Sequence, residues 1–197
     1  MSGTAQEHII IAANTTWYVY NFRSRLILEL LIKGYQVTVL SPADDYVERI
    51  TALGARHIPL PLDNAGTNPL KELAFLCSLF LLLRRLQPAM ILTYTPKVNI
   101  YISFIARLLR IPVVANVSGL GRAFITGGWL RTVTVNLYRF ALRYPRMVFF
   151  QNDDDRNEFV KLGLVDFART DRLPGSGVDL ERFKPLPNAL DAVKTTF

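Results

Sequence analysis

His8-Ile9-Ile10-Ile11-Ala12 is too apolar for a strand with one solvent-facing side, so it predicts a strand buried on both faces of a parallel sheet. The next segment, residues 21–33, carries leucines at helical spacing and stops at Gly34, a residue that favours the end of a helix. Residues 35–40, Tyr-Gln-Val-Thr-Val-Leu, predict a second strand. Strand, helix and strand in this order form the unit from which parallel sheets are built.

The same alternation continues along the chain. It predicts an α/β fold, a three-layer, Rossmann-like domain with a parallel sheet of six or seven strands and helices on both faces. Ligands of such sheets bind beyond the carboxyl ends of the strands. The remaining predicted strands are residues 56–60, 90–94, 112–117, 147–151 and 170–173, and the remaining predicted helices are residues 44–53, 69–86, 98–109, 129–143 and 153–162.

The composition is typical of a globular chain. Half of the 197 residues are apolar and 20% are charged, which excludes a disordered chain. The single cysteine, Cys77, excludes a disulfide-stapled miniprotein and fits a reducing compartment. The first residues lack the basic and apolar regions of a signal peptide, and the longest apolar stretch, residues 73–83, is shorter than the roughly 20 residues of a membrane span. We therefore expect a cytoplasmic protein that does not cross the membrane.

Basic residues dominate one long part of the chain. Residues 1–150 contain 16 basic and 7 acidic residues, whereas residues 151–197 contain 7 and 9. Between Glu72 and Asp153 there are ten basic residues and no acidic one. Such a stretch predicts a positive face for phosphorylated substrates or anionic lipid headgroups. No element known to read nucleic acids accompanies it, so we expect no nucleic-acid partner.

Two segments in this basic window have the composition of a membrane interface. Residues 129–144 mix arginines with tryptophan, tyrosine and phenylalanine, and the apolar run 73–83 ends in Arg84-Arg85. The alternative for both segments is a helix packed on the core with a solvated basic face. The lack of acidic residues favours contact with an anionic membrane surface.

The loop expected after the first strand is polar and aromatic. It contains Asn14, Trp17 and Tyr20 but no glycine, and a dinucleotide site needs glycines to admit the pyrophosphate. Asparagine and aromatic side chains suit the hydroxyls and the apolar face of a sugar ring, whereas the alternative is an ordinary loop with a packed tryptophan. After the fourth strand, Lys97 is placed to meet a phosphate, or is simply a solvated lysine.

Two glycine-containing loops follow later strands. Gly119, Leu120, Gly121 and Arg122 form a candidate anion cradle, because glycines let backbone N–H groups approach a phosphate; a tight turn is the alternative. Residues 175–179, Gly-Ser-Gly-Val-Asp, follow the last predicted strand. Their glycines would let a backbone or a ligand come close; the alternative is a flexible turn. The sequence has no metal-ligand spacing, nucleophile elbow or Cys–His pair, so we expect no metal and assign no catalytic residue.

Several short motifs together resemble the N-terminal half of bacterial family 4 glycosyltransferases with the GT-B fold. Within that family they are most similar to enzymes that extend lipid-linked sugars for surface polysaccharides or glycoprotein glycans. The motifs occur in family order and cover nearly the whole chain: Tyr20-Asn21-Phe22-Arg23, Gly34-Tyr35-Gln36-Val37, Thr95-Pro96-Lys97-Val98-Asn99-Ile100-Tyr101, Ser118-Gly119-Leu120-Gly121, Phe150-Gln151-Asn152-Asp153-Asp154-Asp155 and Pro174-Gly175-Ser176-Gly177-Val178-Asp179.

The resemblance implies a retaining transfer of a hexosyl or N-acetylhexosaminyl group that normally needs no bound metal or cofactor. The implied partners are a nucleotide-sugar, commonly a UDP-sugar, and an undecaprenyl-diphosphate-linked saccharide at the inner face of the cytoplasmic membrane. By the same resemblance, Gly119, Leu120, Gly121 and Arg122 would lie near the donor diphosphate, Gly175, Ser176, Gly177 and Asp179 would border the cleft at a domain junction, and Asn14, Trp17, Tyr20, Arg23, Thr95 and Lys97 would face the acceptor.

The resemblance also implies a domain boundary. Residues 1–183 would form a Rossmann-like acceptor-binding domain, and residues 184–197 would lead toward a C-terminal donor domain that this chain lacks. Without that half of the cleft, we expect the chain by itself not to catalyse transfer. Two alternatives remain. Half of a sugar-nucleotide 2-epimerase would bring more acidic and histidine side chains into the cleft, and a non-enzymatic peripheral membrane module would leave the strand-end loops unexplained.

Overall fold

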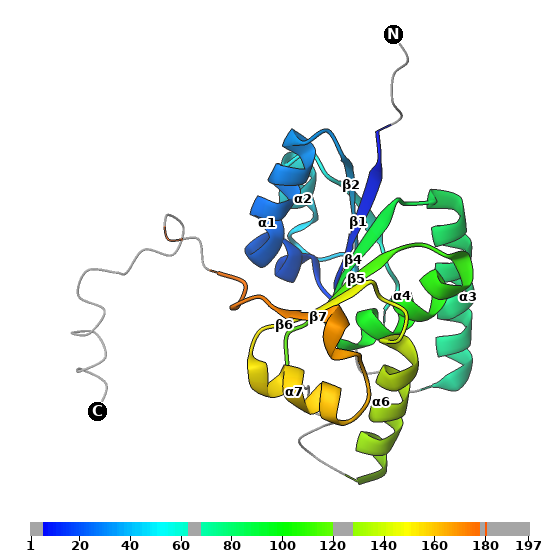
Figure 1. Ribbon diagram of the computed structural model, residues 1–197. Coiled ribbons are helices and arrows are strands. Elements are labelled where there is room, and N and C mark those ends of the chain that lie inside the picture. Colours follow the sequence, from blue (N-terminus) through cyan, green and yellow to red (C-terminus); the bar gives the residue numbers. More distant parts are fainter. Residues whose placement is uncertain (1–5, 63–67, 120–127, 178–179, 181–197) are drawn as a thin grey trace, which may run out of the picture.

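The computed structural model describes residues 6–62, 68–119, 128–177 and 180, and these residues form one seven-stranded sheet (Figure 1). All neighbouring strands are parallel, as expected, in the order β3-β2-β1-β4-β5-β6-β7. The direction in which strands are added therefore reverses at β1 and β4, the place where such sheets bind ligands. The strands are β1 (His8–Ala12), β2 (Gln36–Ser41), β3 (Arg56–Pro59), β4 (Met90–Tyr94), β5 (Val113–Val117), β6 (Met147–Phe150) and β7 (Thr170–Arg172).

Helices cover both faces of the sheet, which confirms the three expected layers (Figure 1). On one face lie α1 (Thr16–Ile32) and α2 (Val47–Ala52), and on the other lie α3 (Pro69–Leu86), α4 (Pro96–Leu109) and α6 (Gly128–Ala141). The helix α7 (Asp153–Lys161) packs against β6 and β7, and a 3₁₀ turn at Phe167–Arg169 leads into β7. Among the helices of the described residues, none is both long and apolar enough to cross a membrane.

Alternate residues of the central strands serve the two helix layers. Ile10, Ile91 and Val113 are buried against α3 and α4, whereas Ile11 and Val39 are buried against α1 and α2. A strand buried on both faces has no solvent-facing side, which is why residues 8–12 are continuously apolar. Each fully buried side chain of this kind stabilises the fold by about 1.5–3 kcal/mol relative to an exposed one.

The helix α1 begins at Thr16, five residues before the predicted start, which corrects the expectation of a loop there. Thr15 caps the helix with its side-chain oxygen, and Asp44, which follows β2, accepts a hydrogen bond from the backbone N–H of Trp17 at 2.8 Å. Because Asp44 is 27 residues away in the chain, no local pattern predicts this second cap. Trp17 and Tyr20 therefore lie on a helix rather than in a loop.

The described part of the expected domain, residues 1–183, forms one sheet with its helix layers. Residues 184–197, the expected linker, lie outside the described residues. The boundary between them stays a prediction.

Candidate functional site

Predicted site residues from distant parts of the chain meet near the carboxyl ends of the strands. Arg23 on α1 donates from Nη2 to Ser176 Oγ at 3.1 Å, 153 residues later in the sequence. Gln151, which follows β6, lies 3.4 Å from the same hydroxyl. Tyr94 ends β4, and its ring centroid lies 4.3 Å from the Arg23 guanidinium. We call Arg23, Tyr18, Tyr94, Gln151 and Ser176 the Arg23 cluster; sequence had assigned Arg23 to the acceptor and Ser176 to the domain junction.

The Arg23 cluster holds the guanidinium in one position. Arg23 stacks on Tyr94 and donates to the Tyr18 hydroxyl at 3.1 Å, while the two tyrosine rings lie 6.0 Å apart. A planar guanidinium can stack and donate in two directions at once, which a lysine ammonium cannot. Tyr18, Tyr94 and Gln151 were not predicted as site residues. In the sequence, Gln151 was marked by the motif Phe150-Gln151-Asn152, which is part of the resemblance to the glycosyltransferases.

Arg23 also keeps an unused donor. Its Nε–H is buried and has no hydrogen-bond partner among the described residues, and none of the described carboxylates lies within ion-pair distance of it. Burial raises the pKa of Tyr94, and the Arg23 charge opposes that rise. Arg23 as a whole is half-buried, and cations withdrawn from water are normally paired with an anion, so this arginine is suited to an anionic ligand.

Thr95 has a strained backbone at the start of α4. Its φ is +73° and its ψ is 145°, a region that residues with a Cβ rarely adopt and β-branched residues least of all. Thr95 occupies the N-cap position, yet its Oγ1 is buried and makes no hydrogen bond to any described residue. Strain of this kind concentrates at ligand-binding sites.

More unpaired oxygens lie in the elements around Thr95. Thr93 Oγ1 in β4, Asn99 Oδ1 in α4 and Asn116 Oδ1 in β5 are buried and have no partner in the described part of the chain. The two asparagines are nevertheless joined, since Asn99 Nδ2 donates to the Asn116 backbone carbonyl at 2.9 Å. Buried polar atoms are normally hydrogen-bonded. The ends of β4 and β5 therefore have a polar interior in which some hydrogen-bonding capacity is unused.

Lys97, predicted to meet a phosphate, is paired with an acidic side chain. Its Nζ lies 2.7 Å from Glu72 Oε1, and the Tyr101 hydroxyl donates to Glu72 Oε2 at 2.6 Å. Both charged side chains are only 20% exposed. Burial and the Glu72 carboxylate together raise the pKa of Tyr101 above its usual value. A phosphate would have to compete with Glu72 for this cation, and the phosphate-binding role of Lys97 stays a prediction.

The other predicted acceptor residues lie at the start of α1. Asn14 is half-buried in the link between β1 and α1. Trp17 is 47% exposed and contacts the Phe22 ring edge-on at 5.7 Å, so much of its surface is open to a ligand. Tyr20 packs against Tyr46 with ring centroids 5.6 Å apart, which makes it part of the contact between α1 and the start of α2.

Of the predicted diphosphate loop, the structure describes Gly119. Leu120, Gly121 and Arg122 lie outside the described residues. Gly119 has a φ of +147°, and a Cβ added there would meet nothing within 4 Å. Glycine is therefore required at this position by its backbone conformation rather than by a close neighbour.

The predicted domain-junction residues include a tight turn after β7. Gly175 donates its N–H to the Leu173 carbonyl at 2.7 Å, and this turn presents Ser176 to Arg23. Gly177 is described and exposed, whereas Asp179 lies outside the described residues. The turn explains how residues that follow the last strand reach the first helix.

A second polar cluster, which was not predicted, lies where α1 meets the ends of β2 and β3. Thr16 Oγ1 donates to the Pro42 carbonyl at 2.8 Å and lies 2.8 Å from Ser41 Oγ, while His57 Nε2 lies 3.2 Å from that hydroxyl. Burial lowers the pKa of His57, opposed by the Ser41 backbone carbonyl and by Asp44. Because Thr16 and Ser41 are fully buried, this cluster fixes the start of α1 rather than presenting a nucleophile.

Comparisons with known proteins find similar sequences. A family model described as a glycosyl transferase 4-like domain matches residues 22–175. A Campylobacter jejuni protein named N,N'-diacetylbacillosaminyl-diphospho-undecaprenol alpha-1,3-N-acetylgalactosaminyltransferase is 27% identical over 173 residues, which cover 85% of this chain and 46% of the relative.

Solved structures share the fold at low sequence identity. HepE of Anabaena in complex with UDP-glucose has a TM-score of 0.65 at 14% identity, covering 95% of this chain and 49% of that one. The UDP-N-acetylglucosamine 2-epimerase of Rickettsia bellii has a TM-score of 0.62 at 14% identity, covering 96% and 52%. The chain thus spans about half the length of the proteins it matches.

Proposed function

Because the chain belongs to the glycosyl transferase 4-like family, whose model matches residues 22–175, we propose that it is the acceptor-binding half of an enzyme that transfers a sugar from a nucleotide-sugar to a lipid-linked saccharide. The name of the Campylobacter jejuni relative describes N-acetylgalactosaminyl transfer to a diphospho-undecaprenol-linked sugar, which supports a lipid diphosphate acceptor. The activity would be at the cytoplasmic face of the membrane that holds the acceptor.

The observation that carries this proposal is the Arg23 cluster. An arginine held by Tyr94 and Ser176, with an unused N–H and no carboxylate partner among the described residues, is built to bind an anion. Phosphate oxygens match the geometry of a guanidinium. Lys97 is already engaged by Glu72, so Arg23 is the stronger candidate for contact with the acceptor diphosphate.

The sugar part of the acceptor would lie nearby. The exposed ring of Trp17 offers an apolar surface to one face of a sugar ring. Asn14 and Tyr20 would complete this side of the cleft.

The donor would face the glycine loops. The presence of UDP-glucose in the HepE structure supports a UDP-sugar donor. Retention of the anomeric configuration and transfer of a hexosyl or N-acetylhexosaminyl group are further parts of the proposal. The residues proposed for the donor diphosphate are Gly119, Leu120, Gly121 and Arg122, and those proposed to border the cleft are Gly175, Ser176, Gly177 and Asp179.

A product assay tests the proposal. The protein translated from its whole reading frame is incubated with undecaprenyl-diphosphate-linked saccharides and a panel of UDP-sugars, and extended lipids are identified by mass spectrometry. Arg23→Lys keeps the charge but loses the stacking and the forked donation. Hydrogen bonds to charged groups contribute about 1.5–3 kcal/mol, so kcat/KM for the lipid acceptor should fall about 10- to 100-fold. Arg25→Lys, exposed on the same helix, is the matched control.

The outcomes separate the alternatives. An unchanged kcat/KM in Arg23→Lys would remove the Arg23 cluster from the acceptor site. Conversion of a UDP-sugar to its 2-epimer without any acceptor would favour the epimerase. Residues 1–197 alone are expected to bind the lipid acceptor without turnover, and absence of both binding and turnover in the whole protein would refute the proposal.

A further inference from the structure

The outer surface of one helix layer is apolar where α3 and α4 lie side by side. Leu73, Cys77 and Leu81 recur at four-residue spacing along α3 and are all exposed, Leu81 to 64%. Leu108, near the end of α4, is 59% exposed. Between the two helices runs a groove of about 380 Å³ lined by apolar side chains, among them these four and Phe104.

The helix α6 extends this apolar surface. Val133, Leu137 and Phe140 are exposed and lie on one stripe of the helix, at positions i, i+4 and i+7. The Phe140 ring lies 5.6 Å from the Phe104 ring, which joins the stripe to the groove. We call the surface formed by Leu73, Cys77, Leu81, Phe104, Leu108, Val133, Leu137 and Phe140 the α3–α4–α6 face.

Arginines cluster where these helices end. Beyond Glu72, in the first turn of α3, none of these three helices carries an acidic residue. Lys97 on α4 pairs with Glu72, and Arg131 on α6 pairs with Glu158 of α7, but the arginines at the helix ends form no ion pair with a carboxylate of the described residues. The arginines at or just after the helix ends are Arg84 and Arg85 on α3, Arg107 and Arg110 on α4, and Arg139, Arg143 and Arg146 on or after α6.

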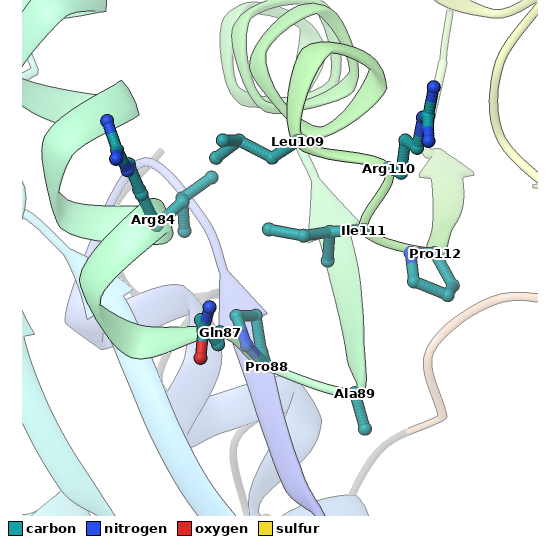
Figure 2. Close-up of a pocket in the computed structure, with 9 residues that line it drawn as sticks. Arg84, Gln87, Pro88, Ala89, Leu109, Arg110, Ile111 and Pro112 are labelled. Carbon is teal, nitrogen blue, oxygen red and sulfur yellow. The ribbon is translucent and has the colours of Figure 1, made fainter.

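A pocket of about 300 Å³ continues the seam between α3 and α4 toward these arginines. Figure 2 shows Arg84 and Arg110 on opposite sides of it, with Leu109 and Ile111 between them. The pocket thus has an apolar wall and a cation on each side. That arrangement suits the boundary between lipid chains and phosphate headgroups.

We propose that the α3–α4–α6 face docks on an anionic lipid bilayer, with its apolar side chains toward the lipid chains and its arginines toward headgroup phosphates. An exposed apolar patch bordered by polar residues marks an interaction site. The excess of arginines over acidic residues on these three helices favours an anionic partner. A second copy of this chain is disfavoured, because a two-fold contact would bring arginine-rich surfaces together. Binding to vesicles requires neither the sugar donor nor the sugar acceptor, so this proposal can be tested independently of the proposed sugar transfer.

Sedimentation with vesicles tests the docking surface. The protein should bind vesicles of phosphatidylcholine mixed with phosphatidylglycerol at low salt, and bind much less at high salt or to phosphatidylcholine alone. The double variant Leu81→Asp, Leu108→Asp should weaken binding at least about tenfold. The double variant Arg84→Gln, Arg110→Gln should weaken it roughly 25-fold, from the contribution of each arginine near an anionic surface.

Matched changes on the opposite helix layer are the controls. Leu28→Asp, and Arg25→Gln combined with Lys33→Gln, alter exposed residues on α1 or directly after it and should leave binding unchanged. Circular dichroism confirms that each variant is folded, and the arginine pair tests the surface even if the Asp pair unfolds. No binding to the mixed vesicles at low salt, or an equal loss in the α1 variants, overturns the proposal. So does a dimer in light scattering that Leu81→Asp abolishes, since the face would then belong to a second copy.

Discussion

Replacing Thr95 by glycine is expected to give a more stable protein than replacing it by alanine. The φ of +73° and ψ of 145° fall in a region that is nearly reserved for glycine, and a residue with a Cβ held there costs about 1–3 kcal/mol. At an ordinary position glycine is less stable than alanine by about 0.5–1 kcal/mol, because it loses more freedom on folding. The strain outweighs that loss, so Thr95→Gly should exceed Thr95→Ala in unfolding free energy by about 1 kcal/mol.

Comparing the two variants with each other isolates the free-energy cost of the backbone conformation, because both lack the threonine hydroxyl and methyl groups. Guanidinium unfolding followed by circular dichroism gives the free energies. In a domain of this size, 1 kcal/mol corresponds to about 2–4 °C in Tm. Thr93 is the matched control, since it lies two residues earlier in β4 and is not among the positive-φ residues.

For Thr93 the order should reverse, with Thr93→Ala more stable than Thr93→Gly by about 0.5–1 kcal/mol. If Thr95→Gly were also less stable than Thr95→Ala, by a similar amount, the strain at the start of α4 would be refuted. The inference that this strain marks a binding site would then lose its basis.

Three further changes test other parts of the structure. Glu72→Gln leaves the largely buried Lys97 without its counter-ion and should lower the unfolding free energy by about 1–3 kcal/mol; a double-mutant cycle with Lys97→Met that shows no coupling would contradict the pair. Asp44→Ala removes the acceptor of the Trp17 N–H and should cost about 1 kcal/mol, with faster hydrogen exchange in the first turn of α1, whereas Asp44→Asn should retain most of the cap. Stability should be constant above about pH 6.5 and fall below it, because the pKa of His57 is lowered by burial and the unfolded chain takes up that proton first. His57→Gln should flatten this dependence, apart from the share of the other histidine, whose pKa burial also lowers; an unchanged pH profile would show that His57 is not desolvated.

Sequence patterns predicted the bounds of those helices and strands whose ends are set by neighbouring residues in the chain. The predicted bounds of the helix at residues 69–86 and of the strand at residues 90–94 match α3 and β4, because an asparagine cap, a proline and an apolar run mark them within a few residues. The predicted start of α1 was wrong although its N-cap, Thr15, is a local signal; Asp44 caps the same turn in addition from another loop. Local sequence contains no information on the contact with Asp44.

The site was less predictable than the fold. The resemblance and the strand-end rule selected Arg23 and Ser176 separately, but their hydrogen bond joins positions 153 residues apart. Tyr94 is indistinguishable in sequence from any aromatic residue of a buried strand. The pairing of Lys97 with Glu72 depends on how α3 packs against α4, so the lysine was expected to be available for a phosphate.

The place of β1 in the sheet has a consequence during synthesis. Ile9 pairs with Val37 of β2 on one side and with Met90 of β4 on the other. A ribosome adds about 5–20 residues per second, so the roughly 50 residues between β2 and the end of β4 take about 3–10 s to make. Throughout that time an isoleucine-rich strand has an open edge, which favours pairing with other chains. A strand that lies inside the finished sheet is thus an exposed edge of the nascent one, and we expect chaperones to engage the chain at that stage.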